Sequence, residues 1–193
     1  MWLKDYKLVD EARRLGYKVV SVEGLDSGEA SLDPNVFSKV VVVSDSISNL
    51  KSALGGLKGP KTVVSVVPLN VEVARWVAHD RRVDSIVMTS RNQVLFDKKQ
   101  ASVMKYYDKP LEVPFTEIRG ANESSLAGFV KRLKLMISRK VPIIISSGAS
   151  GILEYHHPLV VLSFIVKLLD VDYEAAKAML STNPYKVLTR TAI

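Results

Sequence analysis

The sequence contains no cysteine, and it contains only three histidines among its 193 residues. Without cysteine the chain has no disulfide, no thiolate metal site and no cysteine nucleophile. A histidine-rich metal site needs a close cluster of ligands, which His79, His156 and His157 do not form. No uncharged stretch approaches the ~18 residues that span a bilayer, and the first residues lack the apolar segment of a signal peptide. We therefore expect a cytoplasmic protein that works without a metal or another cofactor and away from membranes.

The positive charge of the chain is concentrated in its middle. The net charge is +7. Residues 1–33 carry 5 basic and 7 acidic side chains, residues 34–149 carry 18 basic and 9 acidic ones, and residues 150–193 carry 4 of each. A basic region attracts polyanions through Coulomb attraction and counterion release. This distribution is compatible with nucleic-acid binding, and equally with a basic protein that is merely soluble.

Hydrophobic patterning predicts six strands with helices between most of them. The strands are mostly continuous apolar runs rich in β-branched residues, which is typical of parallel strands buried on both faces. Gly16 is a predicted helix terminator, and Asn70, Asp172 and Asn183 are predicted N-terminal caps. The predicted strands are 17–22, 39–43, 62–67, 84–88, 111–115 and 142–146. The predicted helices are 4–15, 71–79, 98–107, 122–140, 158–169, 172–180 and a short helix opened by Asn183 and Pro184, and loop 26–35 is expected to be flexible.

This alternation of strands and helices predicts an α/β fold with a parallel sheet. The number and spacing of the strands favour a small or incomplete TIM-like (β/α) barrel, with parallel strands and outer helices. We expect residues 1–193 to form a single (β/α) barrel domain. An open doubly wound sheet is the alternative, and strand spacing alone does not separate the two.

Two groups of basic residues are candidates for phosphate contacts. Arg91, Lys98 and Lys99 come directly after a predicted strand, at the end of a barrel where functional residues gather. The second group is the run 131–134 with Arg139 and Lys140 beyond it, at the end of the longest predicted helix. A solvated outer helix face is the alternative interpretation of the second group.

The turn 146–151, Ser-Ser-Gly-Ala-Ser-Gly, follows the last predicted strand. Barrel enzymes often bind phosphate at such a position through backbone amides. The turn lacks the Gly-Lys-Ser/Thr ending of a P-loop and the spacing of a dinucleotide fingerprint. The turn is therefore either a flexible connection or the phosphate-binding site of a small-molecule enzyme. The sequence supports the second interpretation less than the first.

Several segments in order along the chain resemble the ribonuclease P thirty-kilodalton subunit family, archaeal component 3. Each segment alone is weak evidence for this family, but the occurrence of all of them in the same order over most of the chain is specific to it. The C-terminal quarter carries most of the likeness, with a strand, a Ser-Ser turn and a tail of paired helices. The segments are 15–22, 64–88, Leu111-Glu112-Val113, Ile143 to Ala149, Pro158, 172–178 and Ser181-Thr182-Asn183.

The resemblance implies a barrel related to the polymerase-and-histidinol-phosphatase superfamily. Phosphoesterases of that superfamily open with a His-x-His pair, which this sequence lacks. Its N-terminus also starts almost directly at the first predicted helix, so we expect the first barrel strand to be shortened or missing. Where relatives often carry an arginine and a proline, this chain has His156-His157-Pro158, which predicts a weaker and pH-sensitive phosphate contact.

The family resemblance further implies a subunit of ribonuclease P that supports the catalytic RNA in removing the 5′ leader from precursor tRNA. It implies as partners the ribonuclease P RNA, the RRM-like component 2 in a heterotetramer, and other ribonuclease P protein subunits. We expect no catalytic residue in this chain. The alternative is a metal-dependent phosphoesterase on the same barrel. The candidate RNA-binding residues are Arg91, Lys98, Lys99, Arg139, Lys140, His156 and His157.

Overall fold

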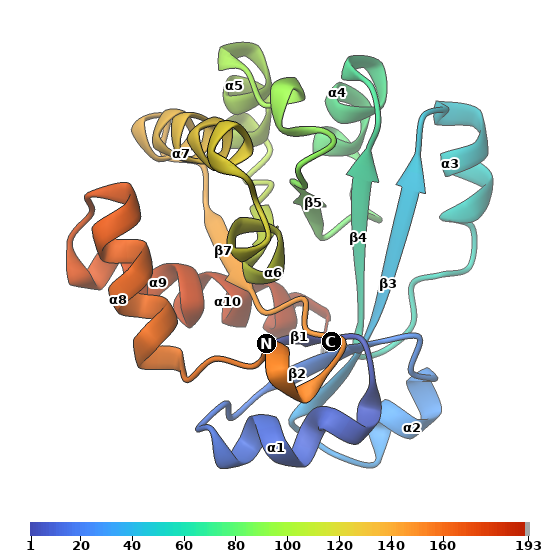
Figure 1. The fold of residues 1–193 in the computed structure, drawn as a ribbon. Helices are drawn as coiled ribbons and strands as arrows, with labels where there is room; N and C mark the ends of the chain where they lie inside the picture. Colours follow the sequence, from blue (N-terminus) through green and yellow to red (C-terminus); the bar gives the residue numbers. More distant parts are fainter. Residues whose placement is uncertain (192–193) are drawn as a thin grey trace.

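Parallel strands follow one another around the molecule in chain order, as a computed structural model of residues 1–191 shows (Figure 1). Each strand pairs with the strands before and after it in the sequence, and every pairing is parallel. The seven strands are β1 (Trp2–Leu3), β2 (Val20–Glu23), β3 (Val36–Ser44), β4 (Thr62–Pro68), β5 (Ser85–Val87), β6 (Leu111–Pro114) and β7 (Ile143–Ser146).

The sheet closes between its first and last strands. Leu3 pairs with Ala149 in a parallel bridge. The Lys4 amide donates to the Ala149 carbonyl at 3.0 Å, and the Gly148 amide donates to the Trp2 carbonyl at 3.1 Å. A doubly wound sheet reverses its strand order and keeps two free edges. The sequential order and the closing bonds therefore confirm the TIM-like barrel and exclude the doubly wound alternative.

Helices surround the strands on the outside. α8 packs against α9, and α9 packs against α10. α10 lies across the amino ends of the strands, because its Asn183 side chain donates to Ile143 and its Thr191 carbonyl accepts from Lys61. The helices are η1 (Tyr6–Leu8), α1 (Val9–Arg14), α2 (Ser27–Ser31), α3 (Ile47–Ala53), α4 (Val71–His79), η2 (Gln93–Leu95), α5 (Lys98–Tyr106), α6 (Phe115–Arg119), α7 (Glu123–Ser138), η3 (Ile152–Glu154), α8 (Pro158–Leu169), α9 (Tyr173–Leu180) and α10 (Thr182–Thr191).

Most of the predicted boundaries are confirmed. The Asn70 side chain accepts a hydrogen bond from Val73 and caps α4, which spans its predicted residues. Asp172 caps α9 in the same way through Ala175. Gly16 follows the end of α1 with a φ of 93°, a conformation that costs glycine nothing.

Several details of the sequence prediction are wrong, and it contained neither α3 nor α6, whose first residue Phe115 was assigned to a strand. The barrel has seven strands rather than six, because Trp2–Leu3 forms a two-residue β1 that is too short to leave a sequence pattern. β2 begins at Val20 rather than at residue 17. The expected flexible loop 26–35 contains α2, which Asp26 caps. Asn183 is the second residue of α10 rather than its cap, since its side chain bonds to a strand carbonyl instead.

Candidate nucleic-acid interface

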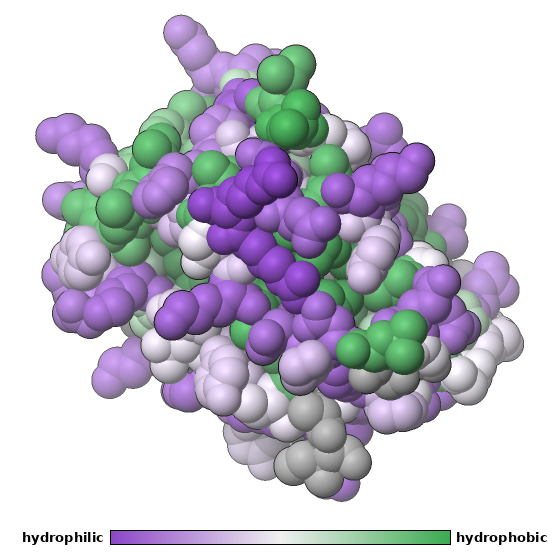
Figure 2. Space-filling view, turned by 90° about the horizontal axis from the view of Figure 1, so that it is seen from below, coloured by the Kyte–Doolittle hydropathy of each residue, from purple (hydrophilic) through white to green (hydrophobic). Residues whose placement is uncertain are grey.

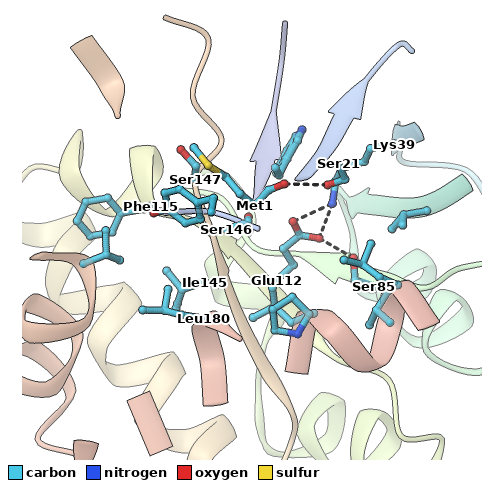
Figure 3. Close-up of a pocket in the computed structure, with 18 of the residues that line it drawn as sticks. Met1, Ser21, Lys39, Ser85, Glu112, Phe115, Ile145, Ser146, Ser147 and Leu180 are labelled. Carbon is cyan, nitrogen blue, oxygen red and sulfur yellow. Dashed lines mark hydrogen bonds and ion pairs between the residues drawn. The ribbon is translucent and has the colours of Figure 1, made fainter. Parts of the chain in front are cut away.

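A buried ion pair crosses the interior of the barrel. Lys39 Nζ of β3 donates to both carboxylate oxygens of Glu112 on β6, each at 2.8 Å (Figure 3). Both side chains are 3 % exposed. Ser85 Oγ of β5 donates to the same carboxylate at 2.7 Å and is bonded to Ser65 Oγ of β4. The Trp2 ring of β1 lies over Lys39, with 4.6 Å from Nζ to the ring centre. Side chains from five strands therefore meet at one charge pair.

The environment of Glu112 keeps its carboxyl group charged. Burial alone raises the pKa of a carboxyl group, because a low-dielectric medium disfavours the charged form. The nearby charge of Lys39 and the hydrogen bonds from Lys39 and Ser85 outweigh burial, and the pKa of Glu112 lies below its ordinary value. The Ser146 hydroxyl faces the same cavity and has no hydrogen-bond partner within residues 1–191.

The cavity around this ion pair is too small for a substrate. Its volume is about 50 Å³, and it is lined by residues that include Ser21, Ser85, Phe115 and Ser146. A water molecule needs roughly 10–15 Å³ of such space, whereas pockets for small ligands measure about 300–1,000 Å³. The interior therefore has room for a few waters, and the ion pair is a structural element rather than a catalytic one.

Sequence reasoning missed Lys39 and Glu112, although a signal was present. Both are charged residues inside runs that were predicted to be buried strands, Lys39 at the start of 39–43 and Glu112 between Leu111 and Val113. A charge buried without a partner is strongly unfavourable. One lysine and one glutamate in separate buried strands thus indicate a pair, but the pattern does not show which strands face each other.

The first group of candidate basic residues lies at the carboxyl ends of the strands. Arg91 is exposed in the loop after β5, and Lys98 and Lys99 are exposed in the first turn of α5. Positive charge at a helix N-terminus opposes the helix dipole and does not stabilise the helix. None of the three side chains forms an ion pair within residues 1–191. They are free to meet an anion.

Arg139 and Lys140 lie at the opposite end of the barrel. They connect α7 to the first residues of β7, so they stand at the amino ends of the strands. Both side chains are exposed, and neither has an ion-pair partner in the described part of the chain. Lys140 has a φ of 57°, a left-handed conformation that is uncommon for residues other than glycine. The structure thus divides the seven candidate residues between two ends of the barrel.

The two adjacent histidines have different surroundings. The His156 ring packs edge-on against Phe115, with ring centres 5.1 Å apart, and its Nδ1 donates to the Glu154 carbonyl at 3.0 Å. His157 caps α8, since its Nδ1 accepts from the Leu159 amide at 3.2 Å. His156 is partly exposed and His157 is exposed. Each keeps a free Nε2, but their structural roles hold the two rings apart.

The turn after β7 already has a carboxylate bound to it. The amide and the hydroxyl of Ser150 both donate to the Glu154 side chain, at 2.7 and 2.8 Å. These bonds lower the pKa of Glu154, so the carboxylate stays charged. Across the adjoining polar pocket, Glu117 accepts the amide of Ser90 in the same manner. The Ser150 donors of this turn and the Ser90 amide are therefore occupied by the protein's own acids.

The basic run 131–134 lies on the outer face of α7. Phe129, Leu133 and Met136 form the buried face of this helix, whereas Lys131 and Lys134 are exposed. This placement agrees with a solvated outer face. Within residues 1–191, no group of three or more His, Cys, Asp or Glu side chains is arranged to hold a metal ion.

Comparison with known families decides the assignment. The family model described as RNase P subunit p30 matches residues 6–193, nearly the whole chain.

The chain belongs to the RNase P subunit p30 family.

The fold agrees with this membership. The structure is similar to a chain in the cryo-EM structure of archaeal ribonuclease P with mature tRNA, with a TM-score of 0.82 and 17 % sequence identity. The match covers 98 % of this chain and 90 % of that chain. A search of curated proteins found no match. The resemblance read from the sequence is thereby confirmed.

Membership of the RNase P subunit p30 family supports a role as a protein subunit of RNase P, and the phosphoesterase alternative is not favoured. None of the helices in residues 1–191 has the length and apolar character that crossing a membrane requires. The barrel of this chain has unpaired basic side chains at both ends. Its interior, between the two ends, has room only for a few waters.

Breaking the interior ion pair tests its structural role. Lys39→Met leaves Glu112 charged and buried without its partner, which typically costs about 3–5 kcal/mol. We expect the free energy of unfolding in urea to fall by about that amount, and the double variant Lys39→Met/Glu112→Leu to recover most of it. Lys98→Met, an exposed control, should change stability by less than about 0.5 kcal/mol. If Lys39→Met were as stable as Lys98→Met, the ion pair would not have this structural role.

The pH dependence of stability gives a second test. Because the folded-state pKa of Glu112 is lowered, its contribution is fully present above the unfolded-state pKa of about 4.3 and is lost as pH falls through the lower folded-state pKa. Urea unfolding at a series of pH values from about 6 down to 3 should therefore show a steeper loss for the unaltered chain than for Lys39→Met/Glu112→Leu. If stability fell equally with pH in both proteins, the folded-state pKa of Glu112 would not be lowered, which would contradict this prediction.

Proposed function

We propose that this chain binds the RNA of RNase P through its unpaired basic side chains and supports 5′-leader removal from precursor tRNA, with the RNA performing the cleavage. The observation that carries the proposal is the combination of family membership with exposed, unpaired cations at both ends of the barrel. The absence of a substrate-sized cavity around the interior charges also favours a scaffold over an enzyme.

The proposed RNA contacts follow from exposure and charge. Lysine and arginine side chains that neutralise phosphates release counterions and supply most of the affinity for RNA. His157, whose Nδ1 accepts from Leu159, adds an Nε2–H donor at the start of α8, and His156 presents its Nε2 beside Phe115. The proposed contacts are Arg91, Lys98, Lys99, Arg139, Lys140, His156 and His157.

A protein partner fits an apolar groove beside α8. The groove has a volume of about 630 Å³ and runs between α8, α9, α10 and the start of β2. Leu159, Tyr173 and Tyr185 line it and are 51–60 % exposed. The face over α1 and α2, in contrast, shows hydrophilic side chains over most of its area and hydrophobic ones only in small separate groups (Figure 2). We assign the groove to the RRM-like component 2.

The proposal includes a heterotetramer with component 2 and contacts with other RNase P proteins, as the family resemblance implies. It treats residues 1–193 as one functional domain. It also includes a cytoplasmic location, with which the cysteine-free sequence is compatible.

Reconstitution tests the function directly. Omitting this chain from the cognate RNA and the other protein subunits should reduce the rate of precursor-tRNA cleavage, and adding it back should restore the rate. Lys99→Ala and Lys140→Ala should each lower the salt dependence of RNA binding by about one unit of slope, because each removes about one phosphate contact. Lys7→Ala, also exposed, is the matched control. Undiminished cleavage without the chain would contradict the proposal.

Charge placed in the apolar groove tests the partner assignment. Leu159→Lys puts an ammonium group where the partner is expected to cover an apolar side chain, so binding of component 2 should weaken by about tenfold or more in calorimetric titration. Leu32→Lys introduces the same charge at an exposed leucine directly after α2, outside the groove, and should leave binding unchanged. Equal effects of the two variants would show that the groove is not the binding surface.

A further inference from the structure

Four aromatic rings form a continuous row on the outer surface between α4 and α5. The ring centres of Trp76 and His79 are 6.1 Å apart, those of His79 and Tyr107 are 5.7 Å apart, and those of Tyr107 and Tyr106 are 4.9 Å apart. All three contacts are edge-to-face, which is a favourable geometry for aromatic pairs. We call these four residues the aromatic strip. It ends at the α5–β6 turn, at the amino ends of the strands.

The far end of the aromatic strip contributes little to the fold. Tyr106 is 81 % exposed and Tyr107 is 48 % exposed. The Tyr106 hydroxyl has no hydrogen-bond partner within residues 1–191. Tyr17 and Tyr155, in contrast, are partly buried and donate to the carbonyls of His156 and Leu8. Tyr106 therefore presents a ring to solvent without an evident structural reason.

Positive charge surrounds the aromatic strip. Lys51 Nζ lies 5.6 Å from the centre of the Trp76 ring, and Arg82 Cζ lies 5.8 Å from it. Lys105, beside Tyr106, is exposed and has no ion-pair partner in the described chain.

Two acidic residues border the aromatic strip, and both are neutralised. Asp80 is bonded to Arg82 at 2.8 Å, and Asp108 is bonded to Arg190 at 2.7 Å. The remaining unpaired charge is thus positive, which fits a polyanion and disfavours a basic protein partner.

The charged surface continues from the strip to Arg139 and Lys140. A pocket of about 180 Å³ is lined by Asp108, the residue after Tyr107, and by Pro142, Lys186 and Arg190, among others. Pro142 follows the Arg139-Lys140 pair by two residues. The aromatic strip and the cations around this pocket therefore belong to one surface, which we call the amino-end face.

We propose that the amino-end face binds a single-stranded segment of RNA, with unpaired bases stacked on Tyr106 and Tyr107 and phosphates held by neighbouring cations. This deepens the proposed function and rests on it. Exposed rings combined with basic side chains are the features by which proteins hold single strands, because every base has a face that can stack. A duplex keeps its bases stacked on each other and offers mainly its backbone and grooves. The cations in question are Arg81, Lys105, Arg139, Lys140 and Lys186.

The test measures binding of a labelled single-stranded uridine dodecamer, and of an RNA hairpin stem with equal charge, to the full chain. Tyr106→Ala should weaken binding of the single strand by about tenfold, the loss of one stacked base. Tyr106→Phe, which keeps the ring, should bind within about twofold of the unaltered chain. Neither variant should change binding of the stem.

Two further variants separate stacking from charge. Lys140→Ala should reduce the salt slope for the single strand by about 0.7, whereas Tyr106→Ala should leave the slope unchanged. Tyr6→Ala is the matched control, because Tyr6 is 52 % exposed, lies beside Lys7 and has no ring contact within residues 1–191. It should bind the single strand normally. Thermal melting of each variant checks that the fold is kept.

The inference is overturned if Tyr106→Ala binds the single strand as well as Tyr6→Ala does. It is also overturned if Tyr106→Ala binds RNA normally and instead fails to bind another RNase P protein, since the strip would then be a protein-docking surface. Its failure is distinct from failure of the proposed function. If reconstituted cleavage depends on this chain but Tyr106→Ala does not change RNA binding, the proposed function stands and only the inference fails.

Discussion

The Lys39–Glu112 ion pair is the contact on which the centre of this barrel depends. It joins β3 to β6 across the interior, and the hydroxyls of Ser65 and Ser85 connect the two strands between them to the same carboxylate. An unpaired charge at this depth is strongly unfavourable, so the strands that carry Lys39 and Glu112 keep their positions only together. The interior of this barrel is therefore a polar network linked by one charge pair, and the unpaired cations lie at its two ends.

The two ends of the barrel differ in how their charges are used. At the amino ends, several lysines hold loops together: Lys61 Nζ donates to the carbonyls of Ala30 and Asp33, and Lys58 Nζ donates to that of Arg81. Lys109 donates to the carbonyls of Asp80 and Val83, and burial lowers its pKa to about 8. At the carboxyl ends, acidic side chains occupy backbone amides instead. Glu154 at Ser150 and Glu117 at Ser90 fill donors that a barrel phosphoesterase would offer to its substrate.

Sequence patterns predicted the elements with the strongest local signals. The caps Asn70 and Asp172 and the runs that became β3, β4 and β7 are signals carried by neighbouring residues. The expectation of a shortened or missing first strand is confirmed by the two-residue β1, but its residues were not predicted, because Trp2–Leu3 is a strand only through pairing with Ser21 and Val22. Arg91 follows a strand and Lys140 precedes one, so their placement at opposite ends of the barrel follows from the parallel direction of the strands, but sequence does not show which residues near each end lie side by side. The aromatic strip was missed because the rings of His79 and Tyr107 meet only when α4 packs on α5.

Charge in excess of what folding requires is the feature that links this structure to RNA. Lys58, Lys61 and Lys109 have carbonyl partners, so their charges contribute to the fold. Lys105, Lys140 and Lys186 lie in the same region without such partners, and unpaired exposed lysines contribute little to stability. An RNA phosphate supplies the missing counter-charge and releases bound ions as it does so. In the proposed function these unpaired charges are the ones that meet RNA phosphates, whereas the paired lysines stay with the fold.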